Sequence, residues 1–483
     1  MSMTRRQFLG AIPASGMAAA LASCATTARV GTTAPPNILF ILTDDQAPWT
    51  VGALGNAQAH TPHLDRLVRE GVTCGNAFVT TPVCSPSRAG LLCGRYGTEV
   101  GITDWINPTS EPELGLDESH PSWVRALRDA GYRTGLVGKW HLGIQDHHHP
   151  SRFGYDYFAG FRSGGAEVEN TELEIDGKAQ PTEGLLVDRL TDLALEFLST
   201  QDSRPFMLSL HHRSPHRPWL PAAEADAAPY RDKQLSLPDA QYPGMDLKEV
   251  DKWYREYMSS VSGVDRNVGR LLEYLDKNGL SENTVVIFTS DHGYNMGHHG
   301  IVHKGNGHWI TKFTQEKRKL KEPVTRPNLF DTSLRVPLAV RWPGRLEAGR
   351  TVDNCVTNLD WFPTLLSMAG VDPASGPTTG GRDFLPLLTG DRISWEDSFY
   401  GQYSLHHTAQ ADLRMYRTPE WKLIRDFRNL GRDELYHLAK DPDERLNLLH
   451  DPIAWEQYQL LNTQLLRAME EIGDPLFALA SSV

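Results

Sequence analysis

Positive charge is in short supply in this chain of 483 residues. Lys and Arg number 48 against 60 Asp and Glu, which gives a formal net charge of −12. This balance disfavours a protein that coats nucleic acid or another polyanion, although it leaves room for an anionic substrate in a local basic pocket. Beyond the N-terminus no run of about 20 apolar residues occurs, which excludes a polytopic membrane protein. No self-similar period of about 20 to 50 residues occurs either, so repeat architectures are not expected.

Cysteine is also scarce. The five cysteines stand at positions 24, 74, 84, 93 and 355, and no two of them form a Cys-x-x-Cys pair. A zinc ribbon or a dithiol redox motif is therefore not indicated. In an exported protein two of the cysteines could form a disulfide, but the spacing does not identify which two. A buried free thiol is the simpler alternative for Cys74 and Cys355.

The first 35 residues have the pattern of an export signal followed by a tether. Arg5 and Arg6 precede a short, Ala-rich apolar run, which is typical of a twin-arginine signal. The run ends in Leu-Ala-Ser ahead of Cys24, and this resembles a lipoprotein cleavage box, where the Cys becomes the lipidated first residue. Cleavage nearby without a lipid is the alternative. We expect export to the periplasm or to the cell surface as a lipoprotein, with the membrane contacted only through Cys24.

The body of the chain alternates between patterns of buried strands and amphipathic helices. The apolar run Asn37–Leu42 suits a strand covered on both faces. Further strand candidates lie at 134–137, 206–210 and 284–289, and helix candidates at 61–68, 122–129, 185–198, 250–277 and 359–369. Thr61 is expected to cap the first helix, and Pro62 suits its first turn. The alternation predicts an α/β domain over residues 36–372, with a large, mostly parallel sheet flanked by helices.

The amino-acid composition and the predicted elements change from residue 373 onward. A segment dense in Gly and Pro is followed by two short strand patterns, 413–418 and 421–426, and by a helix pattern at about 453–472. We therefore predict a smaller C-terminal α+β domain over residues 373–483.

Polar residues follow three of the strand candidates. Asp44 and Asp45 come after the first, Lys139 and His141 after the second, and Asp291 and His292 after the last. Ligands of open α/β sheets bind at the carboxyl ends of the strands, so one edge would gather these groups. Taken alone, an isolated Asp pair is more often a turn or a helix cap. Their repetition at strand ends is the first indication of an active site.

Residues 84–95 carry the most specific motif, Cys-Ser-Pro-Ser-Arg-Ala-Gly-Leu-Leu-Cys-Gly-Arg. The motif resembles the modification site of the type I sulfatases of the alkaline-phosphatase superfamily, with Cys93 where that family usually has Thr. This position is read by the modifying machinery, so the departure concerns modification and not the chemistry. Other segments that match in the same order are 37–45, 138–143, 214–218, 289–293, 335–337, 359–364 and 380–388. The resemblance runs from about Asn37 to Leu449 and implies an alkaline-phosphatase-like sheet.

The resemblance implies hydrolysis of a sulfate ester. The ester oxygens carry negative charge that repels a nucleophile, so catalysis needs charge neutralisation and a strong nucleophile. In the family the motif Cys is oxidised to formylglycine by a maturation enzyme, so Cys84 would become a hydrated aldehyde. One of its hydroxyls attacks sulfur in line, and deprotonation of the other expels sulfate.

The resemblance also implies a divalent cation. Asp44, Asp45 and Asp291 offer hard oxygen ligands that suit Ca²⁺ or Mg²⁺. The family places its fourth protein ligand directly after the third Asp; that residue is usually Asn and is His292 here. An imidazole is less typical of calcium. We expect Ca²⁺, with Mg²⁺ as the alternative.

The basic residues of the site follow from the same resemblance. Arg88 would hold the modified side chain and balance charge, and Lys139 and Lys304 would neutralise sulfate oxygens. His141 would take the proton from the spare hydroxyl; if residues 138–142 are extended, it points to the same side as Lys139. His216 would contact sulfate and protonate the leaving oxygen.

A basic, polar insertion covers residues 305–327. It would shape substrate choice, or it is a solvated surface loop, and the sequence favours neither. The candidate contacts to sugar are His298, His299, His303, Asn306, His308 and Trp309.

Three functions remain open. The first is removal of sulfate from a sulfated saccharide or related ester, which suits an exported bacterial enzyme. The second is hydrolysis of phosphonate monoesters or phosphodiesters, because the superfamily uses the same groups for phosphoryl transfer. The third is a non-catalytic binder of sulfated glycans in which Cys84 stays a thiol.

Overall fold

The computed structural model describes residues 34–200, 202–313 and 324–481. Residues 35–483 form one compact unit. The predicted export signal and Cys24 lie outside the described residues, as does the middle of the 305–327 insertion. Among the described helices, none combines the length and the apolarity that a membrane crossing requires.

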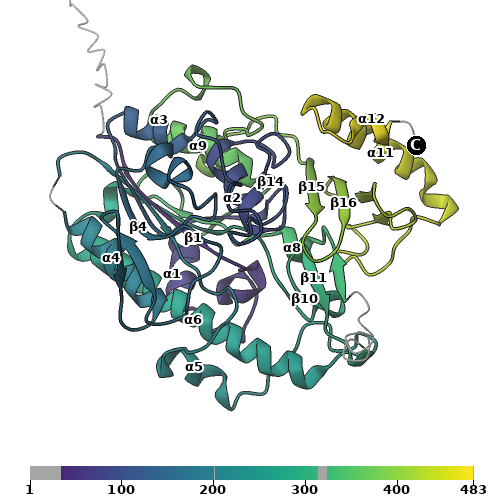
Figure 1. The fold of residues 1–483 in the computed structure, drawn as a ribbon, viewed down its shortest axis with the longest axis horizontal. Coiled ribbons are helices and arrows are strands. Elements are labelled where there is room, and N and C mark those ends of the chain that lie inside the picture. Colours follow the sequence, from purple (N-terminus) through teal and green to yellow (C-terminus); the bar gives the residue numbers. More distant parts are fainter. Residues whose placement is uncertain (1–33, 201, 314–323, 482–483) are drawn as a thin grey trace, which may run out of the picture. The chain divides into compact units, whose positions relative to one another are not determined.

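A ten-stranded mixed sheet, counted over the described residues, forms the centre of this unit (Figure 1). Its strands, in spatial order, are β14 (Arg350–Thr357), β2 (Val72–Phe78), β13 (Ala339–Arg341), β8 (Thr284–Ser290), β1 (Asn37–Thr43), β7 (Phe206–His211), β3 (Arg133–Lys139), β4 (Tyr157–Phe161), β5 (Glu172–Ile175) and β6 (Lys178–Pro181). The middle of the sheet is parallel: β1 pairs with β7 and β8, and β3 pairs with β7 and β4. Antiparallel pairing enters through β13 and through β5 and β6.

Helices cover both faces of this sheet, which explains the unbroken apolar run of β1. Ile38 and Phe40 pack in one buried cluster, with residues of α2, α3 and α9. Leu39 and Ile41 point the other way, into a second cluster with residues of α1, α4 and α6. A strand buried on both faces has no polar side to show in its sequence. Ahead of the C-terminal sheet, the α-helices of the described residues are α1 (Pro62–Glu70), α2 (Cys84–Cys93), α3 (Trp123–Asp129), α4 (Leu186–Ser199), α5 (Glu224–Arg231), α6 (Leu247–Lys277), α8 (Asp331–Leu334), α9 (Trp361–Met368) and α10 (Leu385–Thr389).

Two small antiparallel sheets complete the unit. One has the order β12 (Thr325–Pro327), β11 (Asn306–Trp309), β10 (Ile301–His303), β9 (Asn295–Met296). The other has the order β15 (Phe399–Leu405), β16 (Ala411–Arg417), β17 (Lys422–Asp426), β18 (Glu434–Tyr436). The C-terminal helices α11 (Trp455–Glu471) and α12 (Phe477–Ala480) share a buried cluster with this second sheet. The α/β fold with a smaller C-terminal sheet is therefore confirmed, while the boundary at residues 372 and 373 stays a prediction.

The predicted cap of α1 is wrong. Pro62 does open the helix, but the Thr61 side chain makes no cap bond. It donates instead to the Asp65 carboxylate at 3.1 Å. The helix is capped from a distance: Asp265, on α6, accepts hydrogen bonds from the amides of His63 at 2.9 Å and Leu64 at 2.7 Å. The sequence predicted Thr61 as the cap because it directly precedes the helix. In the structure α6 packs against α1, and its Asp265 carboxylate accepts both amide hydrogen bonds instead.

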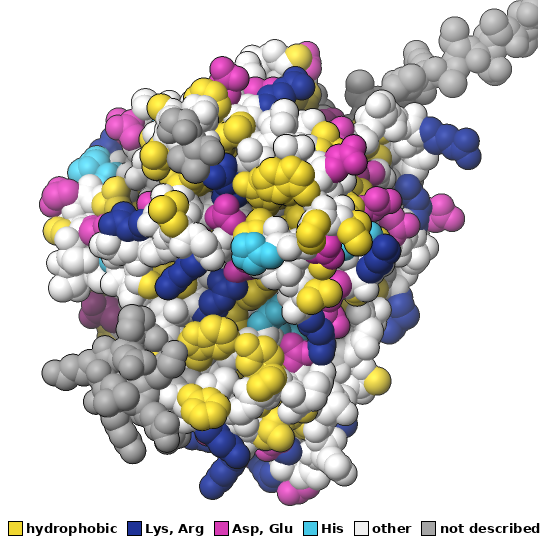
Figure 2. Space-filling view, turned by 90° about the vertical axis from the view of Figure 1, so that its right-hand side faces the viewer, with side chains coloured by type: hydrophobic (Ala, Val, Ile, Leu, Met, Phe, Trp, Pro, Cys, Tyr) yellow, Lys and Arg dark blue, Asp and Glu magenta, His cyan; other side chains and the backbone are white. Residues whose placement is uncertain are grey.

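The face in Figure 2 mixes basic and acidic side chains, with hydrophobic side chains between them. This face shows no broad field of positive charge, in keeping with the net acidity of the chain.

Candidate active site

The carboxyl ends of parallel strands bring the predicted residues together. Thr43 at the end of β1 pairs with Ser290 at the end of β8, so Asp44, Asp45, Asp291 and His292 follow neighbouring strands. The Asp291 amide donates to the Thr43 carbonyl at 3.0 Å, which keeps the two strand ends in register beyond the ladder.

Cys84 reaches this edge as the first residue of α2, all ten of whose residues are buried. The Ser87 hydroxyl donates to the carbonyl of Asp291, and the Asn358 amide donates to the Ser87 carbonyl at 2.9 Å. The first bond attaches the first turn of α2 to the residue after β8, and the second attaches it to the residue after β14. A helix N-terminus favours negative charge, which suits an anion beside Cys84.

The Cys84 sulfur lies within reach of an acid, an imidazole and an ammonium group. Its Sγ is 3.5 Å from Asp44 Oδ1, 3.4 Å from His292 Nε2 and 3.0 Å from Lys304 Nζ. Cys84, Asp44, Asp291 and His292 form a group whose ligand atoms lie within 4.8 Å of one another.

Three buried cations compensate the three buried carboxylates. Lys139 Nζ lies 2.5 Å from Asp44 Oδ2, and Lys304 Nζ lies 2.7 Å from Asp45 Oδ1. Arg88 Nε donates to Asp291 Oδ2 at 2.9 Å. The cluster is therefore close to neutral as it stands, and a bound divalent cation would leave a positive site for an anionic ester.

His292 is oriented in the way that a metal ligand requires. Its Nδ1 lies 2.9 Å from the Gly293 carbonyl, which can only accept, so Nδ1 carries the proton. In the neutral ring the Nε2 lone pair then faces carboxylate oxygens, at 3.2 Å from Asp291 and 3.4 Å from Asp45. A lone pair among anionic oxygens is unfavourable unless a cation or a proton lies between them. The donor set therefore fits a divalent cation.

A further orphaned atom supports the same conclusion. Asp45 Oδ2 is buried and has no hydrogen-bond partner among the described residues. The ring nitrogen His216 Nε2 lies 3.8 Å from this oxygen, which is too far for a hydrogen bond. Burial outweighs the Lys304 ammonium and raises the Asp45 pKa to about 6. A buried carboxylate oxygen without a donor is costly, and a coordinated cation would satisfy it.

Electrostatics single out Cys84 among the cysteines. Burial and the Asp44 carboxylate would raise its pKa, but the Lys139 and Lys304 ammonium groups and the hydrogen bond with His292 lower it to about 6. Burial outweighs the nearby guanidinium groups and raises the pKa of Cys74 and Cys355 to about 12. All four cysteines of the described residues are free and buried, so the disulfide left open by the sequence is not formed.

The two predicted proton-transfer histidines are held differently. His141 does not continue an extended strand, because β3 ends at Lys139 and His141 has a left-handed backbone with φ 60°. Its Nε2 donates to the Ile106 carbonyl at 3.0 Å, and its Nδ1 has no partner among the described residues. The pKa of His141 is lowered by burial and by Lys139, which keeps the ring neutral.

His216 is the more accessible of the two. It is one-quarter exposed, whereas the other nine predicted site residues are buried. Its Nδ1 donates to the Arg217 carbonyl at 2.6 Å, which leaves Nε2 toward Asp45.

Two supporting residues escaped the sequence interpretation. The Tyr257 hydroxyl, from α6, donates to the Asp45 carbonyl at 2.6 Å. The Arg213 guanidinium donates to the carbonyls of His216 at 2.7 Å and Pro218 at 2.9 Å, which fixes the loop that carries His216. Neither lies in a motif that the sequence interpretation used, although Arg213 directly precedes the matched segment 214–218.

The insertion is in part a hairpin. Lys304 lies between β10 and β11, and the His303 and His308 rings are 5.2 Å apart on the paired strands. The middle of the insertion, 314–323, lies outside the described residues, and its last three residues form β12.

Comparisons with known proteins agree with this site. The family described as Sulfatase matches residues 36–371, and the family described as N-sulphoglucosamine sulphohydrolase, C-terminal, matches residues 326–472. The N-acetylglucosamine-6-O-sulfatase of Bacteroides thetaiotaomicron is 26% identical, over 94% of this chain and 89% of that protein.

Solved structures share the fold at lower identity. A protein in complex with its substrate D-glucosamine-2-N,6-O-disulfate superposes with a TM-score of 0.77, at 23% identity, over 91% of this chain and 99% of that one. The phosphonate monoester hydrolase of Agrobacterium radiobacter superposes with a TM-score of 0.70, at 21% identity, over 90% of this chain and 96% of that one. The family match spans most of the chain and coincides with the cluster around Cys84, and the chain therefore belongs to the sulfatase family of sulfuric ester hydrolases.

Proposed function

We propose that this sulfatase removes sulfate from a sulfated saccharide, with Cys84 acting in its formylglycine form beside a divalent cation. The observation that carries the proposal is the position of the Cys84 sulfur, 3.0 Å from Lys304 Nζ and 3.5 Å from an Asp44 oxygen at the strand ends. Support for a saccharide comes from the N-acetylglucosamine-6-O-sulfatase to which the chain is similar.

The cation would be held by Asp44, Asp45, Asp291 and His292. His292 Nε2 lies 3.8, 3.4 and 3.2 Å from an oxygen of these three carboxylates in turn, and Asp45 Oδ2 has no hydrogen-bond partner among the described residues. Ca²⁺ is the expected ion and Mg²⁺ the alternative. When bound, it supplies positive charge that stabilises oxygens of the nucleophile and of the sulfate group.

The chain's own basic groups bind the sulfate group. Lys139 and Lys304 are buried and fixed by Asp44 and Asp45, so their charges are already oriented when the ester arrives. Arg88, bonded to Asp291 and to the Lys139 carbonyl, holds the nucleophile side of the site.

Two histidines divide the proton transfers. His141 is neutral, and its unpartnered Nδ1 accepts the proton of the spare hydroxyl at position 84. His216 is the accessible group, and we assign it the protonation of the leaving oxygen.

Two measurements test the proposal. Mass spectrometry of the peptide that contains Cys84 must show the aldehyde or its hydrate in exported protein; an intact thiol throughout would support the non-catalytic glycan binder. Product analysis on matched sulfated and desulfated saccharides must show release of inorganic sulfate only from the former. Faster turnover of aryl phosphonate or phosphodiester than of any sulfate ester would favour the phosphoryl-transfer alternative.

Export belongs to the same proposal. The twin-arginine pattern and Cys24 predict a lipoprotein of the periplasm or cell surface. The mass of the mature N-terminus distinguishes a lipidated Cys24 from simple cleavage, and an uncleaved cytoplasmic chain would contradict export.

A further inference from the structure

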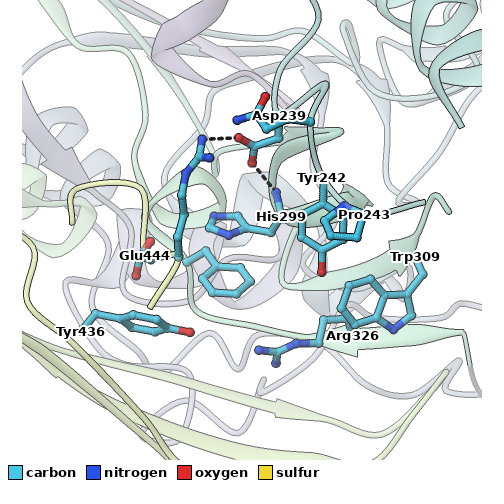
Figure 3. A pocket seen from close by; sticks show the side chains of 11 residues that line it. Asp239, Tyr242, Pro243, His299, Trp309, Arg326, Tyr436 and Glu444 are labelled. Carbon is cyan, nitrogen blue, oxygen red and sulfur yellow. Dashed lines mark hydrogen bonds and ion pairs between the residues drawn. The ribbon is translucent and has the colours of Figure 1, made fainter. Parts of the chain in front are cut away.

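A second cavity lies apart from the catalytic cluster. It has a volume of about 370 Å³, and none of the residues that line it belongs to the cluster around Cys84. One wall is the 239–243 segment. Another is the β9–β12 sheet, with the turn between β9 and β10 and with Phe330 after β12. The third is formed by the C-terminal residues Tyr436, Glu444 and Arg445 (Figure 3). A cavity of this size falls in the range of small-molecule sites.

Aromatic rings supply the apolar part of the lining. Tyr242 and Trp309 have ring centroids 6.4 Å apart and planes tilted by 31°. The His299 ring stacks on Phe330, with centroids 3.8 Å apart and planes within 8°. Such flat faces pack against the C–H surfaces of a pyranose ring, while the edges of Tyr and His remain available for hydrogen bonds.

The charged groups of the lining are paired with one another or with near neighbours. Arg445 lies 2.5 Å from Asp239, Glu444 lies 2.5 Å from Lys422, and Arg326 is bonded to Glu434. Burial lowers the pKa of His299 to about 3, so its ring is neutral at pH 7. Fixed ion pairs offer acceptors and donors to hydroxyl groups but no spare positive charge for a second sulfate. The lining therefore favours an uncharged ligand with many hydroxyl groups.

Backbone strain marks the cavity as a built site. A left-handed backbone costs a non-Gly residue about 1–2 kcal/mol, and such residues cluster at functional sites. Eight occur among the described residues: Asp45, His141 and His303 at or beside the catalytic cluster, Asp239, His299 and Glu444 in the cavity lining, and Asn170 and Asp176 beside the β5–β6 hairpin. The cavity lining thus has as many non-Gly residues with a left-handed backbone as the region of the catalytic cluster.

One hairpin joins the cavity to the catalytic cluster. Lys304 lies at the turn between β10 and β11, whereas Trp309 pairs with Ile301 at the open end. The four residues of β11 that follow the turn span roughly 13 Å, at about 3.3 Å per residue. The separation is longer than one sugar ring, so a single oligosaccharide with several rings is needed to reach both places.

We propose that this cavity binds an uncharged sugar ring of the same saccharide whose sulfated ring enters the catalytic cluster. The inference rests on the proposed function, because it assigns the cavity to that substrate. Residues of this distal subsite are specificity residues: they touch the saccharide but not the reacting atoms.

Direct binding tests the subsite without catalysis. The Cys84→Ala chain is titrated calorimetrically with a panel of uncharged, unsulfated oligosaccharides of two to six rings, drawn from animal, plant and algal glycans. We expect at least one to bind, and Trp309→Ala to weaken that binding about tenfold or more, with Trp309→Phe restoring most of it. The matched control is Trp455→Ala, which removes an exposed ring on α11. Absence of any binding that depends on Trp309 across the panel would overturn the proposal.

Kinetics separate the subsite from the function on which it rests. In mature enzyme, Trp309→Ala and Tyr242→Ala should raise KM for sulfated oligosaccharides about tenfold and leave kcat/KM for a small aryl sulfate unchanged. Equal losses on both substrates would show a structural role and contradict the subsite. An enzyme that cleaves aryl sulfate but no sulfated saccharide would refute the proposed substrate, whatever the panel shows.

Discussion

Lys304 donates a hydrogen bond across 3.0 Å to the sulfur of Cys84, although 220 positions of sequence separate the two residues. The lysine comes from the β10–β11 turn and the cysteine from the first turn of α2. Their contact places a positive charge beside the side chain that we propose as the source of the nucleophile. Together with the Lys139 ammonium, which has the larger effect, it lowers the pKa of Cys84 far below that of the other buried thiols.

Lys139 should be essential for stability as well as for activity. Lys139→Met removes the partner of Asp44 at 2.5 Å and leaves a buried carboxylate whose remaining cations, Arg88 and Lys304, are each 4.0 Å away. We expect a loss of about 3–5 kcal/mol in the free energy of unfolding, measured by denaturant titration of the metal-free chain. The control is Lys252→Met on the exposed face of α6, where only a 3.9 Å contact to Glu256 is lost. A change under about 1 kcal/mol for Lys139→Met would show that Asp44 is not ionised there.

Divalent cations should bind and stabilise the folded chain. Three carboxylates and His292 Nε2 converge, and Ca²⁺ that binds only the folded state at 100 times its Kd adds about 2.7 kcal/mol. Thermal unfolding with Ca²⁺, Mg²⁺ or chelator measures this effect.

The fourth ligand is tested by two substitutions. His292→Asn offers an oxygen ligand and should retain the Ca²⁺-dependent rise in Tm, while His292→Ala should weaken Ca²⁺ binding about tenfold or more, as determined by calorimetry. Identical binding by wild type and His292→Ala would remove His292 from the site.

His216 should matter most when the leaving group is poor. A general acid contributes about 10²–10⁴ in rate, and the need for it falls as the leaving oxygen becomes less basic. We expect His216→Ala to lower kcat/KM about a hundredfold or more for a saccharide sulfate and much less for an aryl sulfate with an acidic phenol. A loss that is uniform across leaving groups would assign His216 to sulfate binding instead.

Asp265 should make stability fall as the pH rises. It accepts the amides of His63 and Leu64, yet burial outweighs these bonds and raises its pKa from 3.8 to about 7. Between pH about 4 and 7 the folded chain keeps a proton that the unfolded chain has lost, so the stabilisation is complete below pH about 4 and is lost toward pH 7.

The test is the pH dependence of unfolding in Asp265→Asn. Its amide oxygen still accepts the α1 amides, so this slope should flatten and the free energy of unfolding at pH 8 should rise by up to about 4 kcal/mol. Asp353→Asn, at an exposed position, is the control. An unchanged slope in Asp265→Asn would contradict the raised pKa.

Much of the fold was predictable because its signals are local. Each predicted strand from 37 to 289 appears, as β1, β3, β7 and β8, with ends within two residues of those expected. The helix α2 was not predicted, because Ser, Pro, Arg and Gly within it serve the site and obscure any apolar stripe. The cap of α1 was assigned to the wrong residue for the opposite reason, since Asp265 acts from another helix.

The sequence by itself determined the chemistry: which acids and bases stand at strand ends, which thiol opens the 84–95 motif, and in what order the motifs follow. Each of these patterns consists of residues that are close together in the sequence, so a short segment is enough to recognise it. The tertiary structure alone decided that Lys304 meets Cys84, that His292 turns its lone pair toward three carboxylates, and that Asp239, Trp309 and Tyr436 enclose one cavity. Such contacts depend on how segments that are far apart in the sequence pack together, and no pattern within one segment specifies the distance between two segments.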